Sequence, residues 1–134
     1  MSERESTTES FVVTARSAGL AAGIGAIVLA STAVFTITGG MGLHNVLVGS
    51  VIATVASVLA FRTDQGSPSI ALAAVLVVVG LWTAASPFVF GITRELVLWL
   101  NGAAGGLVAL LAVASIYGIL RPSTETRSSG ATGA

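Results

Sequence analysis

Hydrophobic residues fill two long stretches of the chain, and short polar or glycine-rich segments separate and flank them. No charged residue occurs between Arg16 and Arg62, a stretch far longer than the roughly 20 residues that one membrane crossing needs. The segment 39–42 holds three glycines and divides this stretch, because glycines at such density interrupt helices. The second stretch, residues 69–120, is divided in the same way by the polar turn 91–95.

The pattern therefore predicts an all-α membrane protein in which four transmembrane helices form two helical hairpins. The expected helices cover residues 17–38, 43–61, 69–90 and 96–120. The expected segments are a polar tail (1–16), a first transmembrane hairpin (17–61), a loop (62–68), a second transmembrane hairpin (69–120) and a disordered tail (121–134) rich in Ser, Thr and Gly.

Composition supports lipid as the solvent. Of 134 residues, 54% are hydrophobic and only 9% are charged, whereas a soluble domain carries about 25% charged residues. A chain this short cannot hide so much apolar surface inside itself. The formal net charge is zero, so we expect no nucleic acid partner.

Arginine placement predicts the orientation. With four crossings, both tails and the loop 62–68 lie on one side, and that side carries five of the six Arg residues, with only Arg94 opposite. Because positive charge favours the cytoplasmic side, we expect a multi-pass protein of the cell membrane with both termini in the cytoplasm.

An internal repeat relates the two hairpins. Asn45 aligns with Asn101 at an offset of 56 residues, and small residues follow in step after both. Because each unit crosses the membrane twice, the repeats must be parallel, unlike the inverted repeats of many transporters. Upstream, after a shift of four residues at the hairpin, the matched pairs are Leu29 with Leu81 and Gly39 with Gly91.

The third predicted helix carries Ser86-Pro87-Phe88, and Trp99-Leu100-Asn101-Gly102 opens the fourth. At these residues the chain resembles the SPW-repeat family of small prokaryotic membrane proteins, which has two helices per repeat and a Ser-Pro-Trp motif in the first. The resemblance covers about residues 25–117, with Phe in place of Trp. The first unit lacks the Ser-Pro pair and would be degenerate. The family implies an architecture and no settled activity.

Few residues are candidates for chemistry. Pro87 removes one helix hydrogen bond and frees the carbonyl of Thr83, which we interpret as a static kink, relieved by Ser86 or a neighbour, in preference to a hinge. Asn45 and Asn101 are interpreted as helix caps or bonds between hairpins, with a ligand site as the alternative. The motif and packing candidates are Ser86, Pro87, Phe88, Trp99, Asn101, Gly102, Gly106 and Asn45.

Three other side chains are given structural roles. We expect His44 to be solvated at the membrane interface, Trp99 to anchor its helix there, and Trp82 to pack at greater depth. Glycine pairs at four-residue spacing, such as Gly19 with Gly23 and Gly102 with Gly106, allow close approach of helix backbones.

No Asp, Glu, Lys or Arg falls inside a predicted span, which disfavours ion-coupled transport. No catalytic set is visible, and the chain has no Cys, so we expect no enzymatic activity, cofactor or metal.

The leading functional hypothesis is a structural or accessory membrane protein whose helix faces contact lipid, a second copy or a larger membrane partner. The alternative is a small oligomeric permease or channel for an uncharged or small solute, lined by Asn45, Asn101, Ser86 and Thr83.

Overall fold

The computed structural model describes residues 2–132, with side chains from residue 9 to residue 121. Within this part of the chain there are four helices: α1 (Ser2–Val34), α2 (Gly39–Asp64), α3 (Ile70–Val89) and α4 (Glu95–Thr132). All four are long and apolar enough to cross a membrane, and the shortest, α3, has 20 residues, which corresponds to about 30 Å of helix. The predicted four-helix membrane fold is confirmed.

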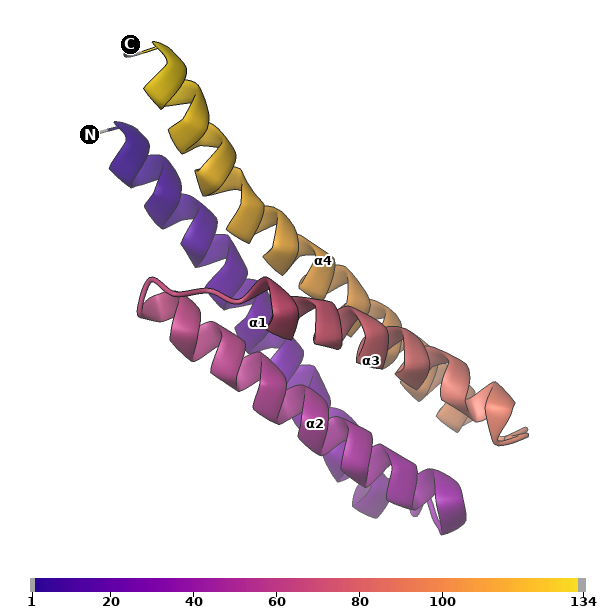
Figure 1. Cartoon of the computed structure of the whole chain (residues 1–134). Helices are drawn as coiled ribbons and strands as arrows, with labels where there is room; N and C mark the ends of the chain where they lie inside the picture. Colours follow the sequence, from indigo (N-terminus) through magenta and orange to yellow (C-terminus); the bar gives the residue numbers. More distant parts are fainter. Residues whose placement is uncertain (1, 133–134) are drawn as a thin grey trace.

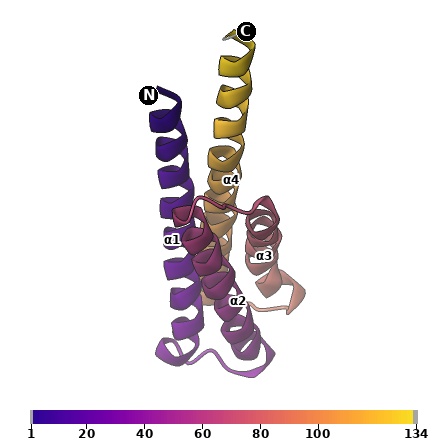
Figure 2. The ribbon, with the colours of Figure 1, turned by 60° about the vertical axis from the view of Figure 1, so that its left-hand side comes forward.

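The helices run alternately in opposite directions (Figures 1 and 2). The connections 35–38 and 90–94 lie at one end of the bundle, called here the hairpin end, and the loop 65–69 lies at the other, the termini end. α1 packs against α2 and α4, and α4 packs against α3, whereas α2 and α3 contact each other least. Among the described residues no Cα atom of α1 lies within 8 Å of one in α3, and the same holds for α2 and α4, so these two helix pairs lie diagonally across the bundle.

The first and last helices, α1 and α4, extend further than the sequence predicts. α1 begins at Ser2, where a polar tail was expected over residues 1–16, and α4 continues to Thr132, through most of the tail 121–134 expected to be disordered. Both ends project past the α2–α3 loop (Figures 1 and 2). Met1 and residues 133–134 lie outside the described part of the chain.

Packing between α1 and α4 explains the early start of α1. Ser10, Thr14 and Ser17 are buried at helical spacing, and the Thr14 hydroxyl donates to the Ser115 carbonyl oxygen at 3.1 Å. These residues are polar but small, so they fit between two helices, and the Thr14 hydroxyl is bonded to backbone carbonyl oxygens. The sequence predicted a polar tail over residues 1–16, whereas Ser10 and Thr14 in this segment are buried on α1.

The first connection is also placed differently. α1 ends at Val34 and α2 begins at Gly39, in place of the predicted limits 38 and 43. The Ile37 amide donates to the Thr32 carbonyl oxygen at 3.0 Å, which closes α1, and Thr36 takes a positive φ of 52°. This is a helix C-terminal motif that glycine ordinarily supplies.

In each hairpin a glycine of one helix meets a glycine of the other: Gly25 meets Gly49 in α1–α2, and Gly80 meets Gly105 in α3–α4. A Cβ on Gly25 would lie 2.9 Å from the Gly49 carbonyl oxygen, and a Cβ on Gly80 would lie 2.8 Å from that of Gly105. No larger residue fits without moving the backbones, so these pairs set the helix separation.

The matched contacts support the predicted repeat but change its register in the first helices. Gly49 and Gly105 keep the offset of 56 that relates Asn45 to Asn101, whereas Gly25 and Gly80 are 55 residues apart. The predicted match of Leu29 with Leu81 implies an offset of 52 and does not follow these contacts. The pairing of the two halves as repeats stays a prediction.

Candidate functional site

The Ser-Pro-Phe motif lies in the last turn of α3. Pro87 is buried and has no N–H to donate to the Thr83 carbonyl. The Ser86 hydroxyl donates to that oxygen instead, at 2.8 Å, as the sequence suggested. The Ile92 amide then donates to the Pro87 carbonyl oxygen at 2.8 Å. The motif therefore closes a helix end without leaving a backbone group unbonded in lipid, which is a structural role.

The first hairpin contains an equivalent that the sequence reading missed. Ser31 lies 55 residues before Ser86, is buried, and donates to the Val28 carbonyl oxygen at 2.6 Å. Thr32 stands in the place of Pro87. The sequence does contain a signal for this match, because Ser31 aligns with Ser86 at an offset of 55 residues. The predicted alignment used an offset of 52 and so did not pair the two serines.

Asn45 and Asn101 are both fully buried, and among the described residues neither side chain is hydrogen-bonded to the other. The Asn101 amide donates to the Val97 carbonyl oxygen at 3.0 Å, within its own helix. Within the described residues, Asn45 Nδ2 and Asn101 Oδ1 have no hydrogen-bond partner. The permease candidates Thr83 and Ser86 both donate to α3 carbonyl oxygens.

His44 has partners that the sequence did not predict. It is half-buried, the Trp82 indole N–H donates to its Nε2 at 2.8 Å, and the Phe90 ring lies 5.3 Å away between centroids. Its Nδ1 lies 3.3 Å from Asn45 Oδ1. Since Nε2 accepts from Trp82, Nδ1 carries the proton and donates to Asn45. The chain Trp82–His44–Asn45 joins α3 to α2, where the two hairpins contact each other least, so Trp82 has a polar role besides packing.

An apolar groove opens on the second hairpin at the hairpin end. It has a volume of about 600 Å³. Phe88 and Trp99 border it with 73% and 70% of their surfaces exposed, and Glu95 is its only charged lining residue. A Cβ on Gly102 would meet no heavy atom within 4 Å, so this glycine leaves the groove floor open. The complete lining is Phe88, Glu95, Leu98, Trp99, Gly102 and Ala103.

The remaining glycine pairs face outward. Gly19 and Gly23 on α1, like Gly106 on α4, have no heavy atom within 4 Å of a Cβ position. They do not serve packing inside the chain, as the sequence reading had allowed. On α1 the exposed small residues continue at helical spacing through Ala26 and Ala30, which makes one open face from residue 19 to residue 30.

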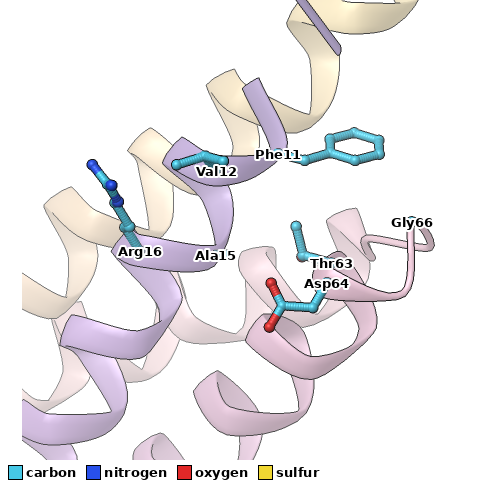
Figure 3. Close-up of a pocket in the computed structure, with 7 residues that line it drawn as sticks. All are labelled: Phe11, Val12, Ala15, Arg16, Thr63, Asp64 and Gly66. Atoms are coloured by element: carbon cyan, nitrogen blue, oxygen red, sulfur yellow. The ribbon is translucent and has the colours of Figure 1, made fainter. Parts of the chain in front are cut away.

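A separate cavity of about 440 Å³ lies at the termini end, between the start of the α1 span and the end of α2 (Figure 3). Phe11 and Thr63 border it, and Arg16 and Asp64 bring opposite charges from the two helices without forming an ion pair with each other. In Figure 3 the Arg16 side chain extends away from Asp64. This arrangement indicates a hydrated surface hollow and assembles no catalytic set.

Comparison with known proteins identifies a family. The model of the SPW repeat domain matches residues 15–115, which is most of the chain and includes both hairpins, so the protein belongs to this family. No curated protein matches, and no solved structure matches.

Proposed function

We propose that this member of the SPW repeat family is a non-catalytic accessory protein of the cell membrane that acts through its outward helix faces, and that two copies associate through α1. The observation that carries the proposal is the open face of Gly19, Gly23, Ala26 and Ala30. Glycines that serve packing inside the chain are in close contact, but Gly19 and Gly23 have no neighbour within 4 Å of a Cβ position.

Small residues four apart allow two helix backbones to approach closely in lipid, where dispersion and interhelical polar contacts drive association. The α1 face suits this role better than Gly102 on α4, because the bulky Trp99 shares the face of Gly102 and is 70% exposed. Exposed Leu20 and Ile27 flank the α1 face and supply side-chain packing around the close approach.

The orientation that we propose has both termini in the cytoplasm, supported by the excess of Arg at the termini end. The chain contains no Cys, so single cysteines can be introduced into an otherwise unreactive protein. A cysteine in place of Ser67 should be protected from a membrane-impermeant maleimide in intact cells, and one in place of Thr93 should be labelled. The reverse labelling pattern would overturn the orientation.

Native mass spectrometry after gentle extraction tests the association. The wild-type protein should give a dimer. The double variant Gly19→Leu with Gly23→Leu should raise the monomer–dimer ratio at least tenfold. Both positions have free space, so the fold should survive. Gly106→Leu, also at an open position on α4, is the matched control and should remain dimeric. A monomeric wild type, or dissociation by Gly106→Leu alone, would refute association through α1.

The same preparations in liposomes test for the permease alternative. An accessory protein predicts no solute flux above that of protein-free liposomes. Saturable flux that is lost in Asn101→Leu while the oligomer persists would favour the permease and contradict our proposal.

A further inference from the structure

We propose that the groove of the second hairpin is a binding site for a phospholipid with an ammonium-bearing zwitterionic headgroup, with phosphatidylethanolamine as its occupant. The site lies on α3 and α4, away from the α1 face invoked above, and its existence does not depend on association of two copies.

The groove is charged at one end and apolar at the other, as a phospholipid is. Glu95 is the first residue of α4 and is exposed at the hairpin end, where the helices emerge toward water. Gly102 lies seven residues further along α4, about 10 Å deeper at 1.5 Å per residue. Leu98, between these levels, and Ala103, next to Gly102, add apolar lining. A phospholipid whose headgroup lies at Glu95 therefore has its acyl chain over Gly102.

Charge and ring chemistry select the head. The Glu95 carboxylate is the only charged lining group, and it accepts hydrogen bonds from a primary ammonium. The exposed faces of Trp99 and Phe88 also attract cations. Arg94 directly precedes Glu95 and offers a positive charge at the same level for a phosphate. An ammonium and a phosphate in one headgroup match this pair of charges, whereas the headgroup of phosphatidylglycerol has no ammonium.

The first hairpin provides an internal control for the groove. At the matched positions α2 carries Gly39 where α4 has Glu95, Leu43 where it has Trp99, and Val46 where it has Gly102. The carboxylate and the indole are both absent, and the valine occupies the position of the open floor. The shared packing of the hairpins does not require a groove, so its residues are free to serve binding.

Native mass spectrometry from an equimolar mixture of phosphatidylethanolamine and phosphatidylglycerol, with identical acyl chains, tests the proposal. The wild type should retain the ethanolamine lipid at least fivefold over the glycerol lipid. Gly102→Val, which copies the first hairpin, should lose most of the retained lipid. Gly106→Val, at an open position outside the groove, should behave as wild type. Glu95→Gln should keep lipid but reduce the preference to less than twofold.

Fluorescence gives a second readout that locates the lipid. The chain has two Trp residues, so Trp82→Phe leaves Trp99 as the sole indole. Brominated phosphatidylethanolamine should quench Trp99 at a several-fold lower mole fraction than brominated phosphatidylglycerol, and Gly102→Val should remove this difference.

Equal retention of both lipids by the wild type, or unchanged retention in Gly102→Val, would overturn the proposal. The α1 association has its own readout in the monomer–dimer ratio, so each proposal can fail while the other stands.

Discussion

The two hairpins share one packing scheme and differ in the surface that they present. Each is joined by a glycine–glycine contact, Gly25 with Gly49 and Gly80 with Gly105. Each ends its first helix with a buried serine that bonds back to a carbonyl three residues earlier. The second hairpin combines these features with a groove that carries a carboxylate and two exposed aromatic rings. The contacts that both hairpins share therefore indicate how each hairpin packs in lipid. The groove that distinguishes the second hairpin indicates where a binding role is to be sought.

Substitution of the contact glycines should reduce stability more than any other change proposed here. The loss should be similar in both hairpins. Gly49→Ala and Gly105→Ala each place a Cβ against backbone of the partner helix, so each should destabilise the protein by about 1–3 kcal/mol through overpacking. Thermal unfolding in detergent measures this loss. Gly106→Ala, at an open position, is the control and should not destabilise. A loss in only one hairpin would contradict the shared packing scheme.

The two serines should differ in importance. Ser86→Ala leaves the Thr83 carbonyl without the bond that Pro87 cannot supply, so it should cost about 1–3 kcal/mol. Ser31→Ala should cost less, because Thr32 retains its N–H for the same carbonyl position.

A double-mutant cycle sharpens this difference between the serines. Pro87→Thr restores the backbone donor, so it should rescue Ser86→Ala in the same denaturation assay. Equal losses at Ser31 and Ser86, or no rescue, would show that proline does not make the second serine special.

The contact between the hairpins should depend on the hydrogen bond of Trp82. Trp82→Phe removes the bond to His44 and should reduce stability by about 0.6–1.7 kcal/mol, the range for polar contacts between helices in membranes. Trp99→Phe, at an exposed ring, should have little effect on unfolding. If His44→Phe and Trp82→Phe proved additive in a double-mutant cycle, the two side chains would not be coupled.

The smallest expected effect comes from the helix ends. Thr36 has φ 52°, whereas the matched position after α3 is Gly91, with φ 64°. A β-branched residue is strained in this region, so Thr36→Gly should stabilise by about 0.5–1 kcal/mol, since glycine adopts positive φ freely. The rise in unfolding temperature measures it. Gly91→Thr should act in the opposite direction, and a loss of stability in Thr36→Gly would argue against the left-handed conformation there.

The hydrophobic pattern and composition of the chain were sufficient to predict four helices and their division into two hairpins. These features follow from the length of chain needed to cross lipid and from the absence of charge in the spans, which are local properties. The sequence also predicted that a nearby donor would bond to the carbonyl that Pro87 frees, and the structure identifies Ser86 among the candidates.

Only the tertiary structure separated residues of one type into different roles. Gly105 lies in the packed interface while neighbouring Gly106 is open, and Ser10 and Thr14 are buried although the segment reads as a polar tail. His44 finds Trp82 thirty-eight residues away, a contact that no local pattern contains. These outcomes depend on which face of each helix meets which neighbour, because in lipid both the inner and the outer faces of a helix are apolar, and hydrophobicity alone cannot tell them apart.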